Sequence, residues 1–194
     1  MMQEYEFLLA SIRQLVPLAD ADAHYLVEAF KPKPLKKKEI LLYAGEISLH
    51  MRFIAKGCLR SYYLDEKAQE HTLQFGVEGW WVNDLISYLT QAPATHFIQA
   101  IEPGTVLQIH RDTLEKLFVQ LPIMERFFRL KIQGGYIALQ ERTMQAMSQP
   151  AEERYRAFRT RYRGIEQRVP QYMVASYLGI TPEFLSALRS RMVL

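Results

Sequence analysis

QYMVASYLGITPEFLSALRSR, residues 171–191, has the pattern of two short helices that cross at a tight turn. Gly179 stands where the chain must take a positive φ to turn, and Ala175 is small where the second helix would pass closest. Thr181 can cap the second helix, and Pro182 suits its first turn, where a missing N–H costs nothing. The residues spaced to form a shared apolar core are Val174, Leu178, Ile180, Leu185 and Leu188.

These features together predict a helix-turn-helix that binds DNA. An ordinary helical hairpin explains the apolar spacing, but it does not require Ala175 and Gly179 together with a capped, short second helix. In a helix-turn-helix the second helix enters the major groove with its N-terminal residues toward base edges. We expect Glu183 to accept a hydrogen bond from a cytosine amino group and the arginines to contact phosphates or flanking positions. The predicted DNA-binding residues are Gln171, Thr181, Pro182, Glu183, Ser186, Ala187, Arg189, Ser190 and Arg191.

The net charge of +3 is concentrated near the C-terminus. Residues 148–194 hold 8 of the 24 basic residues, all of them arginine, and only 4 of the 21 acidic ones. Arginine is the side chain best suited to phosphate oxygens and base edges. A solvated helix face would also use it, so the charge alone favours nucleic acid only modestly.

Between Pro122 and Pro150 the chain runs without another proline, which predicts one long helix. A seven-residue apolar repeat in this helix is typical of a coiled-coil position, although its companion row becomes polar at Glu141. Self-pairing of two chains is therefore expected; the alternative is a helix packed on its own β-domain. Gly134-Gly135 suggests a close backbone approach or a kink, because glycine costs roughly 1 kcal/mol in a helix. The repeat consists of Ile123, Leu130, Ile137 and Met144.

The rest of the chain predicts an α+β fold. Residues 4–16 and 20–30 have the spacing of two short helices, and Pro32 and Pro34 then end the helical pattern. From Leu35 to Ile109, short segments of period two alternate with turn signals, as in an antiparallel roll or sandwich. A further helix is expected over 151–163, closed by Gly164. The predicted parts are an effector-type β-roll domain (1–121), a long connecting helix (122–148) and a helix-turn-helix domain (149–194).

Several classes of function find no support in the composition. The single cysteine, Cys58, can form no internal disulfide and is expected to be a buried apolar filler. The five histidines show no metal-ligand spacing, so no metal or cofactor is expected. The sequence contains no Ser/His/Asp set and no phosphate-binding loop, so we do not expect an enzyme. No apolar run approaches the ~20 residues that cross a bilayer, and the acidic N-terminus is unlike a secretory signal, so we expect a cytoplasmic protein.

The order of these parts, with residues 42–46 (LYAGE) followed by 53–60 (FIAKGCLR), resembles the Crp/Fnr family of regulators. The resemblance implies a roll of the double-stranded β-helix type and a homodimer that binds a roughly two-fold symmetric operator on double-stranded DNA. It also implies that a small-molecule effector bound in the roll changes the arrangement of the two DNA-binding units. The stretch 164–171 is too short for much of the family's β-hairpin wing, so the DNA-binding unit is expected to consist of helices.

The family's cyclic-nucleotide cassette corresponds to residues 81–95. In cAMP-binding members a Gly-Glu pair meets the ribose, and an arginine ten residues later neutralises the cyclic phosphate; this chain has Asn83, Asp84 and Ala94 there. An uncompensated anion in such a pocket costs several kcal/mol, so the resemblance implies that cAMP is not sensed. Trp81 could line a pocket for another molecule, but the roll core is the favoured place for it. The candidate effector-pocket residues are Trp81, Asn83, Asp84, Leu85, Ala94 and Thr95.

The sequence therefore favours a DNA-binding transcription regulator of the Crp/Fnr type. The alternative is a ligand-binding regulatory protein with the same kind of roll that does not bind DNA. Tight binding of a nucleotide without retardation of any DNA fragment would favour this alternative.

Overall fold

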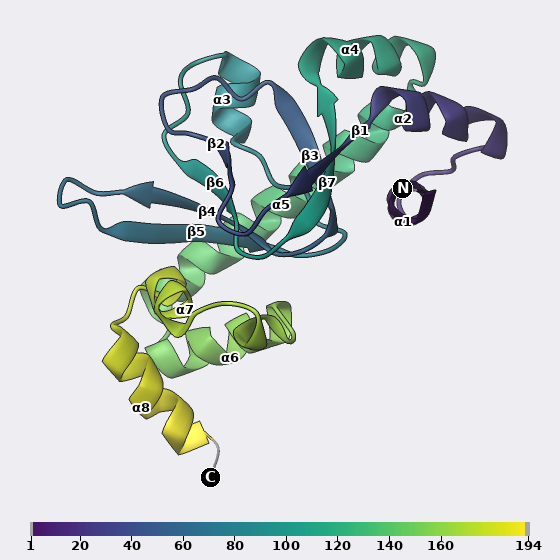
Figure 1. The fold of residues 1–194 in the computed structure, drawn as a ribbon. Coiled ribbons are helices and arrows are strands. Elements are labelled where there is room, and N and C mark those ends of the chain that lie inside the picture. Colours follow the sequence, from purple (N-terminus) through teal and green to yellow (C-terminus); the bar gives the residue numbers. More distant parts are fainter. Residues whose placement is uncertain (1, 193–194) are drawn as a thin grey trace.

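The computed structural model describes residues 2–192, which form a two-sheet β-roll, one long helix and a C-terminal group of helices (Figure 1). The chain begins with helix α1 (Met2–Arg13), a 3-10 turn (Asp20–Asp22) and helix α2 (Ala23–Ala29). Both predicted N-terminal helices are present, although their ends shift by a few residues. Residues such as Leu8, Ile12 and Leu26 are fully buried, as their helical spacing predicts.

Seven strands form the roll as two antiparallel sheets. One sheet has the order β1-β7-β3 and the other β2-β6-β4-β5. A short helix, α3 (Leu85–Thr90), lies between β5 and β6. The strands are β1 (Lys31–Leu35), β2 (Ile40–Leu42), β3 (His50–Lys56), β4 (Leu59–Leu64), β5 (Glu70–Gly76), β6 (Phe97–Ala100) and β7 (Gly104–His110). The expected α+β fold with an antiparallel roll is confirmed.

Strand β1 begins four residues before the sequence places the first strand. Pro32 and Pro34 do not simply end the preceding helix; they lie within β1, which pairs with β7 from Lys31 opposite Gln108 to Leu35 opposite Gly104. Proline cannot donate a ladder hydrogen bond, so it is confined to edge strands, and β1 is at the edge of its sheet.

The two faces of the β1-β7-β3 sheet are buried against different partners. Ile54 and Val106 point inward and pack with Leu59 and Ile98 of the other sheet. The opposite face, which includes Phe53, is covered by α1, α2, α4 (Arg111–Gln120) and the first part of the long helix α5. Both faces of this sheet are therefore buried, and the first part of α5 is one of the elements that cover its outer face.

Helix α5 (Ile123–Ser148) is a single helix that runs behind the roll from α4 to the C-terminal helices (Figure 1). Phe127 is fully buried against the roll, whereas Ile137 and Met144 of the seven-residue repeat are 55% and 68% exposed. A Cβ added at Gly134 or Gly135 would meet no atom within 4 Å, so neither glycine serves a close approach within the described chain. The later part of the apolar repeat thus faces solvent in the single chain.

The C-terminal helices have their own apolar core, which extends into the roll. They are α6 (Ala151–Arg161), a 3-10 turn (Ile165–Gln167), α7 (Gln171–Leu178) and α8 (Pro182–Met192). Helix α6 ends two residues before the predicted end, and residues 162–170 contain no strand. The buried core residues include Tyr155, Phe158, Val174, Ala175, Leu185 and Leu188, together with Phe75 of β5.

The turn between α7 and α8 has the local structure that the sequence predicts. Gly179 adopts φ +66°, and the N–H of Ile180 donates to the Ala175 carbonyl oxygen at 3.1 Å. Thr181 Oγ1 accepts from the N–H of Phe184 at 3.2 Å, and Pro182 is the first residue of α8. A left-handed glycine, a side-chain cap and an N-terminal proline thus set the direction of α8.

Candidate nucleic-acid interface

Helix α8 has one buried side and one open side. Leu185 and Leu188 are 1% and 6% exposed and face α7, while Arg189 is half-buried. Gln171 is exposed at the first residue of α7. Helix α8 lies at the end of the molecule farthest from α4 (Figure 1). The other predicted contact residues, Thr181, Pro182, Glu183, Ser186, Ala187, Ser190 and Arg191, are all exposed on or just before this helix.

Two aromatic residues that the sequence analysis did not include are exposed in the first turns of α7 and α8. Phe184, in the first turn of α8, is 47% exposed, and Tyr172, in the first turn of α7, is 50% exposed. Helical spacing gave only a weak signal, because Phe184 is four residues before the buried Leu188 and lies at the edge of the apolar side of α8. An exposed phenylalanine beside polar residues can make apolar contact with a thymine methyl group.

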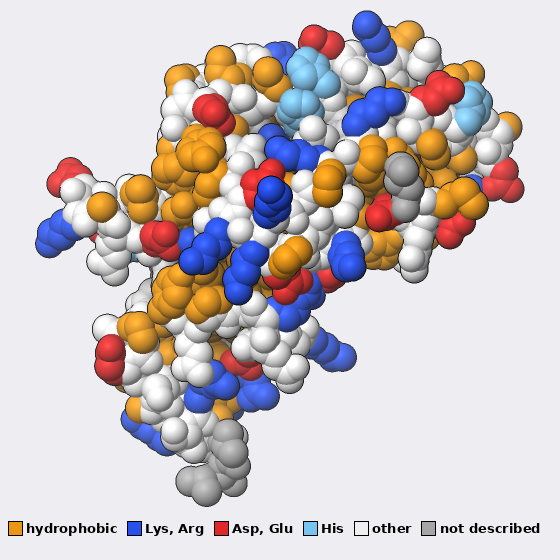
Figure 2. Space-filling view, in the orientation of Figure 1, with side chains coloured by type: hydrophobic (Ala, Val, Ile, Leu, Met, Phe, Trp, Pro, Cys, Tyr) orange, Lys and Arg blue, Asp and Glu red, His pale blue; other side chains and the backbone are white. Residues whose placement is uncertain are grey.

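Basic side chains gather over the C-terminal helices and at their junction with the roll (Figure 2). Arg156 pairs with Glu152 at 2.6 Å, and Arg159 pairs with Glu166 at 3.3 Å. Arg191 and Arg163 are exposed, and within residues 2–192 no carboxylate lies within ion-pair distance of either one. Their guanidinium groups can therefore contact phosphate without first breaking an ion pair.

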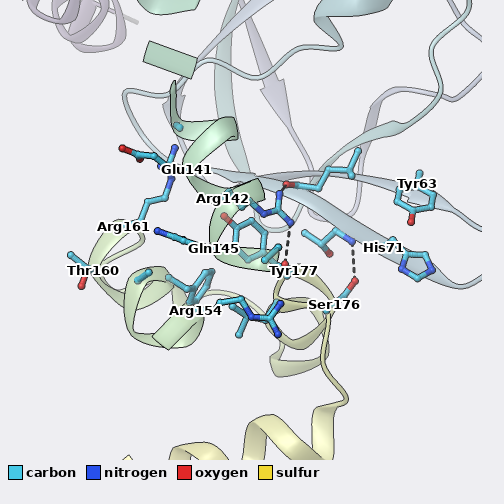
Figure 3. Close-up of a pocket in the computed structure, with 18 residues that line it drawn as sticks. Tyr63, His71, Glu141, Arg142, Gln145, Arg154, Thr160, Arg161, Ser176 and Tyr177 are labelled. Carbon is cyan, nitrogen blue, oxygen red and sulfur yellow. Dashed lines mark hydrogen bonds between the residues drawn. The ribbon is translucent and has the colours of Figure 1, made fainter. Parts of the chain in front are cut away.

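A serine hydroxyl joins α7 to the edge of the roll. The backbone N–H of Thr72 in β5 donates to Ser176 Oγ at 2.9 Å (Figure 3). The same hydroxyl donates to the Glu70 carbonyl oxygen at 3.0 Å. Strand β5 is at the edge of its sheet, so its backbone groups are available for such bonds. The sequence gives no signal for this contact, because the two residues are 104 positions apart.

Arg142 of α5 makes a second attachment. Its guanidinium donates to the carbonyl oxygens of Leu73 in β5 and of Tyr177 in α7, the latter at 3.0 Å. The same group lies beside the Tyr177 ring (Figure 3), and its central carbon is 3.9 Å from the centre of that ring. One side chain of the long helix thus contacts both the roll and the helix-turn-helix.

Aromatic rings fill the space between these attachments. Phe75 of β5 lies within 6.1 Å, centre to centre, of Phe158, Tyr162 and Tyr177. Trp80 stacks on Tyr162 at 5.3 Å. Such geometry is favourable for aromatic pairs. The helix-turn-helix is therefore packed against the roll through α7, while the exposed side of α8 stays open to solvent.

Arg168 provides an ionic attachment at the far side of the same junction. It donates to both oxygens of Glu78 at 2.8 Å and to Glu102 at 2.5 Å. Burial raises the pKa of Glu78, but hydrogen bonds from Arg168 and from the N–H of Gly57 outweigh this effect and lower the pKa overall. Hydrogen bonds to the two carboxylates in turn raise the pKa of Arg168.

The predicted effector residues have partners within the chain. Asn83 Oδ1 accepts from the N–H of Arg52 at 3.0 Å. Asp84, 2% exposed, caps α3 by accepting from the N–H of Ser87 at 2.9 Å, and its other oxygen lies 3.3 Å from His96 Nδ1. Ala94 is buried and bonded through its backbone to the β2–β3 loop, whereas Thr95 is exposed.

Trp81 belongs to the roll core, which is the place that the sequence analysis favours. Its ring lies 5.0–5.9 Å from four phenylalanine rings, and Leu85 packs against the same cluster. Trp81 and Leu85 therefore pack in the core, whereas the other four predicted effector residues do not belong to this aromatic cluster. The four rings around Trp81 are those of Phe30, Phe53, Phe127 and Phe128.

The roll contains a buried arginine that the sequence analysis did not identify as a candidate functional residue. Arg52 of β3 is 4% exposed and shares the inward face of this strand with Ile54. Its guanidinium donates to the His50 carbonyl oxygen at 3.2 Å and has no ion-pair partner within the described chain. Burial lowers the pKa of Arg52 to about 10.

The single cysteine lies in the interior of the protein. Cys58 is buried, as expected for a filler, and its burial raises the pKa of the thiol to about 12. In the described residues, no three His, Cys, Asp or Glu side chains are grouped so as to hold a metal ion. No helix in the same range is long and apolar enough to cross a membrane.

Residues 32–120 match the family model of the cyclic nucleotide-binding domain. The fumarate and nitrate reduction regulatory protein of Yersinia pestis is 30% identical to this chain over 173 residues, which are 83% of the chain and 68% of that protein. The chain belongs to the Crp/Fnr family.

A second Crp/Fnr relative, the anaerobic regulatory protein of Haemophilus influenzae, is 28% identical over 174 residues. These residues are 83% of the chain but 66% of that protein, so the chain spans about two thirds of its curated relatives. Solved structures agree on the fold. The global regulator CLP of Xanthomonas campestris superposes with a TM-score of 0.72 at 10% identity, covering 90% of this chain and 91% of that one. FixK2 of Bradyrhizobium japonicum gives 0.68 at 18% identity, covering 84% of each.

The Arg168 attachment should make the stability of this Crp/Fnr chain depend on pH. Because the pKa of Glu78 is lowered in the folded state, its contribution is present above the ordinary value of 4.5 and is lost as pH falls through the lowered value. We expect Arg168→Gln to lower the free energy of unfolding by about 1 kcal/mol at neutral pH, since these groups are partly exposed. Urea unfolding between neutral and acidic pH would show the difference from wild type shrinking below the ordinary value.

The matched control is Arg156→Gln on α6, which removes an exposed ion pair with Glu152. It should change stability by no more than about 0.5 kcal/mol. A difference between Arg168→Gln and wild type that stays constant as the pH falls would contradict the role of the Glu78 carboxylate.

Proposed function

We propose that this chain is a sequence-specific DNA-binding transcription regulator that acts through the exposed side of α8, and not an enzyme. The observation that carries the proposal is the geometry of α8. Its first turn is capped by Thr181, it leaves α7 through the left-handed Gly179, and its polar side is open to solvent. A helix held at its base with polar residues at its N-terminus fits the major groove. Action on DNA would place the protein in the bacterial cytoplasm.

Two chains are needed for this mode of reading. The seven-residue repeat of α5 leaves Ile137 and Met144 largely exposed, which is an unfavourable state for apolar side chains in water. Pairing of two α5 helices would cover these side chains and place two copies of α8 on one face of a dimer. A homodimer with two-fold symmetry would then match a two-fold symmetric operator.

The same proposal excludes cAMP as the effector. Asp84 is engaged in capping α3 and in its contact with His96, and Ala94 supplies no charge for a cyclic phosphate. The buried cation Arg52 is bonded to the His50 carbonyl oxygen on its own strand. An unidentified effector in or beside the roll remains part of the proposal.

A regulatory protein that binds a ligand but no DNA is the second candidate. The family model covers residues 32–120, which hold the roll and α4 but none of the C-terminal helices, and the helix-turn-helix is packed against the roll through α7. Measurement of DNA binding, described next, separates the two candidates. The second candidate predicts that the protein retains no DNA in a sequence-dependent way at any salt concentration.

Two substitutions in α8 should have different effects on DNA binding. Selection of bound fragments from random DNA would supply the operator. Glu183→Ala should then change the preferred base at one position of each half-site, with a discrimination of about 1–3 kcal/mol lost there. Arg191→Ala should weaken binding to all sequences alike and make the salt dependence shallower by about one counterion per subunit. Fluorescence anisotropy across a salt series measures both effects.

Arg129→Gln serves as the control, since this exposed arginine of α5 contacts Gln133 and lies far along the chain from α8. It should bind the operator as wild type does. If wild type, Glu183→Ala and Arg191→Ala all show the same affinity, base preference and salt slope, the assignment of α8 as the reading helix is wrong.

Substitution on the exposed side of α5 should separate the subunits. Ile137→Glu places a charge in the middle of the proposed interface, where burying it unpaired costs several kcal/mol. Sedimentation analysis should show a dimer for wild type and a monomer for Ile137→Glu, with unchanged circular dichroism. Thr143→Glu, on another side of the same helix, should remain dimeric. A wild-type monomer at micromolar concentration would contradict the proposed pairing.

Calorimetric titration with cAMP tests the exclusion of this effector. We expect no heat of binding at concentrations well above those of cellular nucleotides, because the site lacks a charge at residue 94. Saturable binding that disappears in Arg52→Gln would contradict the proposal and identify Arg52 as the residue that meets the phosphate.

A further inference from the structure

A cavity of about 480 Å³ lies between the roll, α5 and the C-terminal helices, and the proposed DNA contacts do not involve it. This volume is within the range of small-molecule sites in proteins. Trp80 and Trp81 line it from the roll, Gly135 from α5, Tyr162 from the end of α6 and Tyr177 from α7. A ligand in this cavity would contact the roll, α5 and α7 at the same time.

Every charged side chain that lines the cavity is a cation. These are Lys131, Arg142 and Arg161, and within residues 2–192 none of them has a carboxylate at ion-pair distance. Arg142 is bonded to carbonyl oxygens, and the Arg161 guanidinium lies 5.4 Å from the centre of the Trp80 ring. Burial lowers the pKa of Lys131. Three positive charges without compensating acids make the cavity attractive to an anion.

The aromatic walls favour a flat ligand. Trp80 and Tyr162 are stacked with their centres 5.3 Å apart, and Tyr162 meets Tyr177 edge to face at 5.6 Å. A further ring can pack against such walls in offset or edge-to-face geometry. The combination of aromatic walls and unpaired cations is the chemistry that recognises an aromatic anion.

The glycine pair of α5 keeps one wall of this cavity open. Both glycines line it, and a Cβ at either position would meet no atom within 4 Å. Glycine is unfavourable inside a helix, and packing within the described chain gives no reason for it at these positions. Larger side chains at 134 and 135 would occupy space that is now available to a ligand.

We infer that this cavity binds a small molecule with a flat aromatic ring and at least one negative charge. The ring packs against the tryptophan and tyrosine walls, and the anionic group is held by Lys131, Arg142 and Arg161. Of the six predicted effector residues, Trp81 lines this cavity, whereas the other five, Asn83, Asp84, Leu85, Ala94 and Thr95, do not.

The regulatory consequence rests on the proposed DNA binding, whereas ligand binding itself does not. Since Tyr177 belongs to α7 and Trp80 to the roll, a bound ligand stabilises the arrangement in which α7 is docked on the roll. A ligand that binds one arrangement better than another shifts the populations of both, and it thereby changes the affinity for DNA. The adjacent cavity in Figure 3 shares Arg142, Arg161 and Tyr177, so a larger ligand can extend into it.

The test is calorimetric titration of the full chain, without DNA, with 2-naphthoate as an aromatic anion. 2-Naphthamide provides the same ring without charge, and cyclohexanecarboxylate provides the charge without an aromatic ring. We expect saturable binding of 2-naphthoate, one molecule per chain, in the micromolar to millimolar range. Both analogues should bind at least about tenfold more weakly, because each lacks one of the two features that the cavity recognises.

Variants place the binding in this cavity. The double variant Lys131→Gln/Arg161→Gln should lower the affinity for 2-naphthoate by about tenfold or more. Gly135→Leu should abolish binding because its side chain fills the cavity, and its thermal unfolding midpoint should be unchanged or higher. Arg129→Gln, which removes a cation of α5 outside the cavity, should bind as wild type does. Equal binding of 2-naphthoate and 2-naphthamide, unchanged binding by Gly135→Leu, or no binding of 2-naphthoate at millimolar concentration would each overturn the inference.

Operator binding is measured separately, with and without 2-naphthoate. If 2-naphthoate binds as described but no DNA is bound in either case, the cavity stands and the proposed function fails. If DNA is bound but 2-naphthoate is not, the proposed function stands and the cavity assignment fails.

Discussion

The hydrogen bonds between the Ser176 hydroxyl and the backbone of β5 hold α7, and with it the proposed reading helix α8, in place relative to the roll. Strand β5 presents unpaired N–H and C=O groups at the edge of its sheet, and one hydroxyl satisfies one of each. Because α8 is fixed to α7 by the turn at Gly179 and by a shared core, whatever holds α7 also orients α8. The roll can therefore influence α8 through this contact and through the attachments made by Arg142 and Arg168.

These attachments differ from a continuous apolar core in a way that suits regulation. A polar contact near solvent contributes a net stability of only about 0.5–1.5 kcal/mol, because water replaces it when it opens. Ser176, Arg142 and Arg168 each tie the C-terminal helices to the roll at a different place. The aromatic cluster between them adds apolar burial, but several of its rings are shared with cavities. The docked position is thus stable and also open to change by a bound molecule.

The parts of the fold that depend on local sequence could be predicted. The turn at Gly179, the cap by Thr181 and the unbroken α5 follow from residue types at short spacing, and the structure contains each of them. The contacts that position α8 could not be predicted. Ser176 and Thr72 are 104 residues apart, and neither lies in a sequence motif that would indicate the contact. Short helix α3 was also missed, because six residues carry too little periodicity to show a helix.

Strand β1 carries a consequence for how these molecules associate. A free sheet edge normally offers a row of N–H and C=O groups on which a strand of another molecule can add, and this is a common route to aggregation. Pro32 and Pro34 remove two N–H groups from the strand, and Lys31 and Lys33 add positive charge beside them. A second copy is therefore discouraged from extending the sheet at this edge, so the edge does not compete with the proposed pairing through α5.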